Sequence, residues 1–228
     1  MNLSPQDITA IGLSMKIAIT ATAISLPLGF ATAWLMVFRS FRGKVLLEVL
    51  VNLPLTLPPV VIGYLLLLFF GRNGWGGALL KSAGIEFIFT WKAAVVASAT
   101  VGFPLLVRSI RLGMESIDHQ LLQASRSLGA PWYDTLATVV LPLSFRGMLA
   151  GSSLMFARSL GEFGATIIVA GNIPGLTQTI PLAIYDYASS PTGTTMALSL
   201  CAVSIFLSVG ILLLHEVVGK NLENRRSA

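Results

Sequence analysis

The sequence predicts an all-α integral membrane protein with about five transmembrane helices. Of its 228 residues, 54% are hydrophobic and only 11% are charged, whereas about one quarter of the residues are charged in soluble domains. The mean hydropathy is +0.80. Long apolar runs accompany this shortage of charge, which disfavours the alternative of a soluble protein with one large core.

Five apolar runs are long enough to cross a bilayer, because a spanning helix needs about 20 apolar residues. We expect them to form a single transmembrane domain over residues 1–228. The segment 171–194 is polar and interrupted by proline and glycine, so we expect an external loop with a short helix there. The spans are predicted at approximately residues 12–38, 45–70, 90–112, 147–170 and 195–218.

The basic residues predict which side of the membrane each end of the chain occupies. Five spans place the two termini on opposite sides. Ten lysines and arginines lie in the link after the first span, in the segment between the third and fourth spans and in the C-terminal tail. The links on the opposite side carry three, namely Arg72, Lys81 and Lys92. Because cytoplasmic links carry the excess of positive charge, we expect the N-terminus outside and the C-terminus in the cytoplasm. The ten are Arg39, Arg42, Lys44, Arg108, Arg111, Arg126, Arg146, Lys220, Arg225 and Arg226.

The sequence contains few groups suited to catalysis, metal binding or nucleic-acid binding. The single cysteine, Cys201, excludes an internal disulfide and a cysteine-based zinc site. His119 and His215 have no partner at a ligand spacing, so we expect no metal and no cofactor. No arrangement of serine, histidine and aspartate suggests hydrolysis, so we expect no catalytic residue. The net charge of +5 follows the membrane topology, so nucleic acid is not an expected partner.

Residues 120–144, QLLQASRSLGAPWYDTLATVVLPLS, form an amphipathic interruption between two apolar runs. Their arginine-rich surroundings predict that they lie in the cytoplasm. Apolar positions here recur at spacings of four, three and four, which predicts one face of a helix. These positions are Ile117, Leu121, Ala124 and Leu128.

Turn residues predict a hairpin of two short helices in this segment. Ser116 is placed to cap the first helix. Gly129 suits the left-handed residue that ends a helix, and Pro131 suits the start of a second helix at about 132–140. Pro142 should end that second helix. Two roles fit such a hairpin: it rests on lipid headgroups, or it inserts into a groove of a cytosolic partner.

The spacing within this hairpin resembles the EAA loop of ABC-importer permeases. That pattern reads Glu-Ala-Ala, three residues, Gly, nine residues, then Ile-x-Leu-Pro; here Gln, Ser and Val139 replace the glutamate, the second alanine and the isoleucine. The resemblance implies a type I ABC-importer permease fold with a coupling loop over about residues 113–146. It also implies that the loop docks into a separate ATPase subunit. The residues implied in this coupling are Gln123, Ala124, Ser125, Gly129, Leu141 and Pro142.

The chain lacks the phosphate-binding loop that ATPases use. That loop reads Gly-x-x-x-x-Gly-Lys-Ser/Thr, and its backbone cradles the phosphates. The pairs Gly43-Lys44 and Gly219-Lys220 are followed by valine and asparagine and lack the upstream glycine. We therefore expect a transport subunit without its own ATPase site, driven by another polypeptide.

Two features within the predicted spans are candidates for the transport pathway or its gate. Pro58 and Pro59 interrupt the second span, either as a packing kink or as a wall of the pathway. Arg158 and Glu162 are four residues apart and can pair on one helix face. Each charge alone costs about 2.5–3.5 kcal/mol to insert into the membrane, so we expect the two to pair and to face the interior of the bundle. The pair is either structural or acts near a passing anion.

Three longer stretches resemble the permeases of bacterial molybdate importers over most of the chain. They are NLPLTLPPVVIGYLLL, FPLLVRSIRLGMESID and FARSLGEFGATIIVAGNIPGLTQTIPLAIY. The resemblance implies transport of molybdate across the bacterial cytoplasmic (inner) membrane. Sulfate, thiosulfate and tungstate remain alternative cargoes, because these oxyanions share charge and tetrahedral shape.

The resemblance also implies the partners of this chain. They are a second permease copy in a homodimer, two ABC ATPase subunits and an extracytoplasmic oxyanion-binding protein, all acting in contact with membrane lipid. Two alternatives come from other classes. An intramembrane enzyme would need facing catalytic groups, and a membrane scaffold would stimulate ATPase activity without moving solute.

Overall fold

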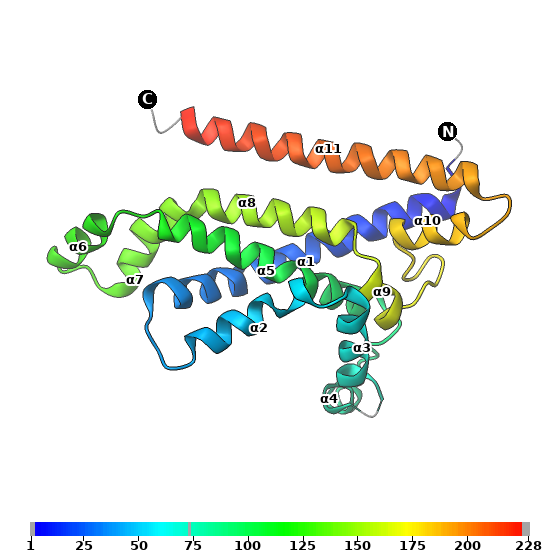
Figure 1. Ribbon diagram of the computed structural model, residues 1–228, viewed down its shortest axis with the longest axis horizontal. Helices are drawn as coiled ribbons and strands as arrows, with labels where there is room; N and C mark the ends of the chain where they lie inside the picture. Colours follow the sequence, from blue (N-terminus) through cyan, green and yellow to red (C-terminus); the bar gives the residue numbers. More distant parts are fainter. Residues whose placement is uncertain (1–2, 73, 225–228) are drawn as a thin grey trace.

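The computed structural model describes residues 3–72 and 74–224, and all regular structure in those residues is helical. This confirms the all-α prediction. Arg225 and Arg226, which we counted for the orientation, lie outside the described residues. The helices, drawn in Figure 1, are α1 (Pro5–Phe38), α2 (Lys44–Thr56), α3 (Pro59–Phe70), α4 (Trp75–Ser82), α5 (Trp91–Glu115), α6 (His119–Ser127), α7 (Trp132–Thr135), the π-helix η1 (Leu136–Val140), α8 (Leu141–Leu160), α9 (Gly164–Val169), α10 (Ile180–Ala188) and α11 (Thr194–Asn224).

Four helical stretches in the described chain are long and apolar enough to cross a membrane. A fifth span results if the bent pair α2 and α3 is counted as one. The prediction of about five transmembrane helices is therefore confirmed. The four stretches are Pro5–Phe38, Trp91–Glu115, Trp132–Leu160 and Thr194–Leu213.

The run 45–70 is two helices that meet at an angle of 115°, not one straight helix. The break lies at Leu57 and Pro58. Leu57 is extended, with φ −85° and ψ 143°, as expected of a residue that precedes proline. Pro54, by contrast, lies inside α2 without ending it. The adjacent Pro58 and Pro59 therefore separate α2 from α3, because neither can supply the backbone N–H that would continue the ladder.

The prediction that Pro142 ends the second hairpin helix is wrong. A continuous helix runs from Trp132 through Pro142 to Leu160. Its residues 136–140 form a π-turn, in which the N–H of Leu141 bonds to the carbonyl of Leu136. The wider turn accommodates a proline ring that would clash with the carbonyl of an ordinary α-turn. The region predicted as span 147–170 is accordingly divided between α8 and the separate helix α9.

The core of the molecule lies around α5, which packs against α1 on one side and α8 on another. Glycine permits the close approach of α5 and α8. A Cβ added at Gly147 would lie 2.7 Å from the carbonyl oxygen of Ser109 and 3.0 Å from the Cα of Gly113. Small residues at such crossings let backbones touch, which is how helices associate where lipid weakens the hydrophobic effect.

The segment 171–194 contains the expected short helix, α10, which packs against α1 and α11 (Figure 1). The Tyr187 hydroxyl donates to buried Asp7 over 2.9 Å, and the N–H of Ile180 donates to the Ser14 hydroxyl over 2.8 Å. A hydrogen bond with Ser4 lowers the pKa of Tyr187, but burial and the charge of Asp7 raise it by more, so its pKa lies above the ordinary value. Tyr187 therefore stays protonated at neutral pH, and its bond holds this segment against the start of α1.

Candidate functional site

The helices α6 and α7 form a hairpin at one end of the molecule, beyond the ends of α5 and α8 (Figure 1). Asp118 caps α6, since its carboxylate accepts the N–H of Gln120 over 2.8 Å. The expectation that Ser116 is this cap is wrong. Helix α5 extends to Glu115, and the Ser116 hydroxyl instead donates to the carbonyl of Gly113 at the end of that helix.

Gly129 makes the turn between α6 and α7. Its φ of +80° is in the left-handed region, which glycine adopts without a Cβ penalty. The N–H of Gly129 bonds to the carbonyl of Arg126, and the N–H of Ala130 bonds to that of Ser125. These bonds satisfy carbonyls at the end of α6, as expected of a glycine-terminated helix.

The inner face of α6 fixes the hairpin to the body of the protein. Leu122 is 6% exposed and joins the core together with Ile117. The Ser125 and Thr135 hydroxyls are 2.8 Å apart and connect α6 to α7. Because α7 continues through η1 into α8, movement of the hairpin must also move α8.

Three of the four positions of the predicted apolar stripe lie on the outer face of α6, which faces away from the protein. The fourth, Ile117, precedes α6 and is buried in the core, so the prediction is wrong for that residue. Leu121 and Ala124 are exposed, and Leu128 is 87% exposed. Beside them lies an open groove of about 760 Å³ between α6, the turn and the start of α8. Exposed leucines around one groove are typical of an interaction surface. Residues that line it include Leu121, Ser125, Leu128, Asp134, Val139 and Pro142.

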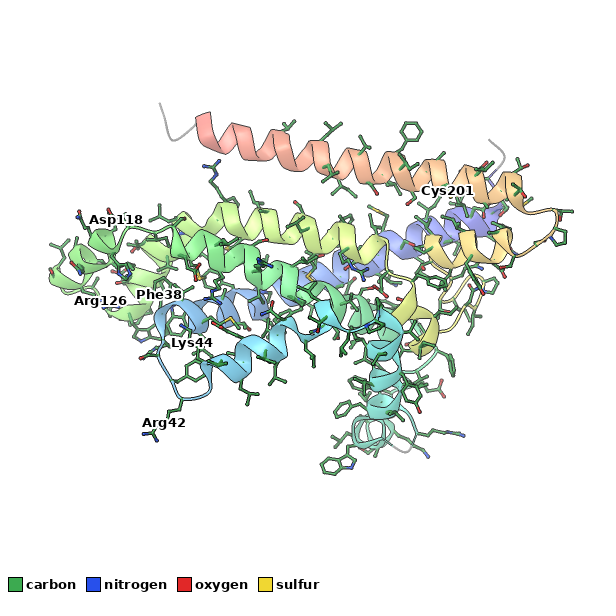
Figure 2. All side chains as sticks on the ribbon, viewed as in Figure 1. Phe38, Arg42, Lys44, Asp118, Arg126 and Cys201 are labelled. Atoms are coloured by element: carbon green, nitrogen blue, oxygen red, sulfur yellow. The ribbon has the colours of Figure 1, made fainter. Side chains whose placement is uncertain are left out.

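The structure brings the six predicted coupling residues to this hairpin and its junction with α8. Gln123 and Ala124 lie exposed on α6, while Ser125 is half-buried against Thr135. The remaining three, Gly129, Leu141 and Pro142, occupy the turn and the first residues of α8, and all are exposed. Figure 2 places Arg126 and Asp118 at the same end of the molecule as Arg42 and Lys44.

Arg158 and Glu162 form an ion pair, with Nη1 of Arg158 2.7 Å from Oε2 of Glu162. The side chain of Glu162 is 1% exposed, whereas that of Arg158 is 31% exposed. The two residues do not share one helix, because α8 ends at Leu160. Glu162 instead lies in the turn to α9, where its Oε1 accepts the N–H of Ala165 over 2.8 Å. The carboxylate therefore joins α8 to α9 and also neutralises the arginine.

The turn that contains Glu162 leads into α9, whose first residue packs against the proline break between α2 and α3. A Cβ added at Gly164 would lie 3.0 Å from the Cβ of Pro59, and one at Gly63 would lie 2.7 Å from the carbonyl oxygen of Ala165. The helices α3 and α9 are thus in backbone contact. The start of α9, which follows Glu162, therefore lies against the proline break at Pro59, although the two come from distant parts of the sequence.

Sequence reasoning missed the residues that attach the hairpin to α1. The rings of Trp34 and Trp132 lie 6.1 Å apart, and Arg39 lies over Trp34 at 5.3 Å. Leu122, which anchors α6, was also missed. A tryptophan at the end of a span and another in the loop are the available signals, because tryptophan favours membrane interfaces.

Comparison with known proteins identifies the family of the chain. Residues 25–224 match the family described as the inner membrane component of binding-protein-dependent transport systems. The molybdenum transport system permease protein ModB of Haemophilus influenzae is 49% identical over 96% of this chain and 96% of its own length. The ModB protein of Escherichia coli is 48% identical over 95% of each chain. A sulfate transport system permease protein of Synechococcus elongatus is 36% identical over 92% of this chain and 75% of its own.

Solved structures share the fold at low sequence identity. A bacterial alginate ABC transporter has a TM-score of 0.77 at 15% identity, covering 96% of this chain and 80% of that one. The MetNI methionine ABC transporter has a TM-score of 0.70 at 15% identity, covering 94% and 93%. These neighbours have the type I permease fold. The chain is a multi-pass protein of the bacterial inner membrane and belongs to the family of binding-protein-dependent transport system inner membrane components.

Proposed function

We propose that this chain is the permease subunit of an ABC importer that carries molybdate into the cytoplasm. The observation that carries this proposal is the near-full-length identity of almost one half to the two molybdenum permeases. The sulfate permease is more distant and matches a smaller part of its own length. Sulfate, thiosulfate or tungstate transport is therefore the less favoured alternative.

The chain itself hydrolyses no ATP in this proposal. It lacks a phosphate-binding loop, so two copies of a separate ATPase supply the energy to a permease homodimer. A binding protein delivers the oxyanion from outside. We further propose that all 228 residues form one permease domain with the N-terminus outside. The clustering of Arg42, Lys44 and Arg126 at the hairpin end supports this orientation, since basic residues favour the cytoplasmic side (Figure 2).

The outer face of α6 docks into a groove of the ATPase. Its exposed Leu121 and Leu128 provide an apolar contact, which suits insertion of a short helix into a partner's groove. ATP-driven closure of the two ATPases then displaces both hairpins. Because each hairpin is bonded internally at Ser125 and Thr135 and continuous with α8, the displacement passes into the membrane-spanning helices.

The displacement reaches the proposed gate through α8. This helix is in close contact with α5 at Gly147, carries Arg158 in its last turn and leads into the turn that holds Glu162. That turn leads into α9, whose first residue packs on Pro59, so movement of α8 changes the contact between α9 and α3. Arg158 is partly exposed, and its remaining guanidinium N–H groups are suited to a passing tetrahedral anion. Glu162 limits how tightly such an anion is held.

Reconstitution into proteoliposomes with the cognate ATPase and binding protein tests the cargo. Uptake of labelled molybdate, tungstate and sulfate is compared with and without ATP inside the vesicles, and vesicles without permease are the control. We expect ATP-dependent uptake of molybdate. Uptake of sulfate alone would overturn the assignment, and ATP hydrolysis without uptake of any of the three would favour a scaffold.

A further inference from the structure

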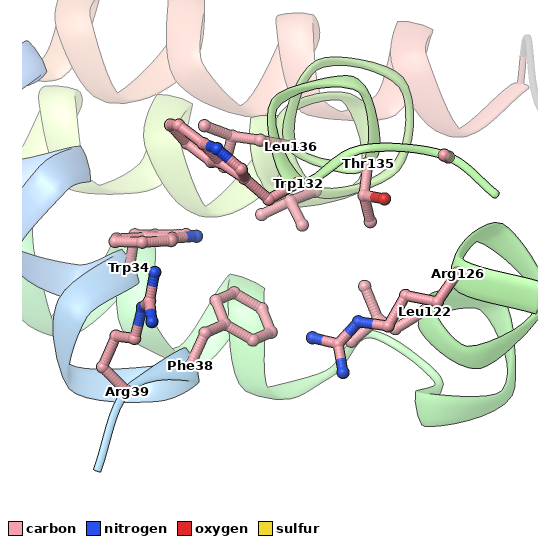
Figure 3. Close-up of a pocket in the computed structure, with 10 residues that line it drawn as sticks. Trp34, Phe38, Arg39, Leu122, Arg126, Trp132, Thr135 and Leu136 are labelled. Atoms are coloured by element: carbon pink, nitrogen blue, oxygen red, sulfur yellow. The ribbon is translucent and has the colours of Figure 1, made fainter.

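A second cavity lies on the inner side of the hairpin, between α6, α7 and the end of α1 (Figure 3). Its volume is about 320 Å³. In Figure 3, Trp34 and Trp132 form one wall, while Arg39 lies beside Trp34 and Arg126 points across the cavity toward Phe38. This cavity is separate from the outer groove, because Arg126 and Leu122 lie on the opposite face of α6 from Leu121 and Leu128.

The cavity contains two positive charges and no negative one. No acidic side chain lines it. Among residues 3–72 and 74–224, no carboxylate forms an ion pair with Arg39 or Arg126; the partner of Arg39 is the ring of Trp34. Two guanidinium groups that face one space repel each other unless an anion lies between them. Guanidinium groups bind phosphate in a bidentate manner, so a phosphate-type anion is the chemistry that this arrangement recognises.

The walls of the cavity favour a phosphate that carries an organic group. Aromatic and aliphatic side chains, Phe38, Leu136 and Val140 among them, form much of the lining, and Thr135 offers a hydroxyl. A free dianion would exchange its hydration for these apolar walls at a cost. A glycerol unit and the first methylenes of an acyl chain would contact them favourably.

The position of the cavity indicates a membrane lipid as the source. It lies at the end of α1, a helix long and apolar enough to cross the membrane, where two tryptophans and two arginines meet. Tryptophan, arginine and lysine concentrate at the membrane interface, and basic pockets between spanning helices bind anionic headgroups. We propose that this cavity binds the phosphate of an anionic phospholipid, which thereby bridges α1 and the hairpin.

Such a lipid would connect the hairpin to the membrane on its inner face while its outer face remains free for the ATPase. The hairpin already contacts α1 through Trp34 and Trp132. A phosphate held by both Arg39 and Arg126 adds a second bridge between the same two elements. The bound lipid therefore stiffens the contact between the hairpin and α1.

The test uses the complete transporter in nanodiscs that contain equal amounts of phosphatidylglycerol and phosphatidylcholine. After mild extraction, native mass spectrometry counts the lipids that remain bound. We expect wild type to retain phosphatidylglycerol preferentially and the double variant Arg39→Gln/Arg126→Gln to bind it about twenty-five-fold more weakly, because each basic residue contributes about a fivefold gain near an anionic surface. Arg42→Gln is the matched control, since Arg42 is exposed, lies in the same link and does not line the cavity.

Three further arms keep the result interpretable. Arg39→Lys/Arg126→Lys should restore part of the retention, because it keeps both charges. If the double glutamine variant does not assemble, the exposed Arg126→Gln alone should lose about fivefold. Inorganic phosphate or molybdate at millimolar concentration should not displace the lipid. Unchanged retention in the glutamine variants would overturn the proposal, as would displacement of the lipid by either free oxyanion.

Discussion

The Oγ of Ser125 lies 2.8 Å from the Oγ1 of Thr135, and this contact joins the two short helices of the hairpin. Ser125 occupies the position where the EAA pattern has its second alanine. The hydroxyl therefore adds a bond between α6 and α7 that alanine cannot make. A hairpin that transmits force benefits from such a bond, because its two helices then move together.

Thr135→Val should loosen the hairpin without changing its shape. The variant loses the contact with Ser125, a hydrogen bond that contributes about 1 kcal/mol, equivalent to a roughly fivefold change in an opening equilibrium. It also loses a longer bond from the Thr135 hydroxyl to the carbonyl of Pro131, and the control variant loses a bond of the same kind. We expect amide hydrogen exchange in α6 to accelerate by about that factor. Thr138→Val is the control, because the Thr138 hydroxyl bonds only to the carbonyl of Asp134 within its own helix. Ser125→Ala should match Thr135→Val, and combining the two should add little; additive effects would show that the contact is not shared.

Leu128→Asp should prevent the ATPase from docking. Leu128 is 87% exposed, so the folded permease tolerates the charge, whereas an apolar partner groove does not. We expect the variant to reach the membrane at normal levels but to lose most of the ATPase that co-purifies with wild type. Ser127→Asp adds the same charge one residue away, off the apolar stripe, and should retain the ATPase. Normal co-purification with Leu128→Asp would mean that the outer face of α6 is not the docking surface.

Gly147→Ala should destabilise the contact between α5 and α8. The new Cβ would lie 2.7 Å from the carbonyl oxygen of Ser109, so the helices must separate. Overpacking of this kind costs about 1–3 kcal/mol. Gly12→Ala is the control, since a Cβ there meets nothing within 4 Å. Thermal unfolding in detergent should show a lower Tm for Gly147→Ala only; equal Tm values for the two variants would contradict the close packing.

Substitutions at Glu162 should separate its two roles. Glu162→Gln keeps an acceptor for the N–H of Ala165 but removes the charge that pairs with Arg158. Glu162→Ala removes both and should be less stable than Glu162→Gln by about 1 kcal/mol, the typical contribution of a helix cap. Exchange of the two residues should fail, because an arginine at 162 cannot accept that N–H. Thermal unfolding and molybdate uptake measure the two effects, and a fully active exchange variant would refute the capping role.

The apolar stripe at Leu121, Ala124 and Leu128 was predictable because helical periodicity is a local property of the sequence. Which side of α6 faces away from the protein was not predictable. Leu122, one residue away, faces the core because the approach angle of α6 is set by contacts with distant residues. Periodicity gives the existence of a face, whereas tertiary packing decides which side it is on.

The prolines illustrate the same limit. Pro58 and Pro59 break the helix, whereas Pro142 does not, although all three lie in apolar surroundings. A preceding π-turn accommodates Pro142, and no local pattern announces that turn. Likewise, the spacing of Arg158 and Glu162 predicted their ion pair, but the end of α8 at Leu160 gave Glu162 a capping role that spacing alone does not reveal.

The most direct test of energy transfer through the hairpin compares two glycine variants in proteoliposomes with the ATPase and binding protein. Gly129 and Gly84 have similar positive φ angles, +80° and +70°, and a Cβ at either meets nothing within 4 Å. The substitutions Gly129→Asp and Gly84→Asp therefore impose comparable backbone strain, but only the first changes the hairpin. ATP hydrolysis and molybdate uptake are measured together. We predict that Gly84→Asp transports normally and that Gly129→Asp loses uptake driven by ATP hydrolysis; wild-type uptake per ATP in Gly129→Asp would contradict the account.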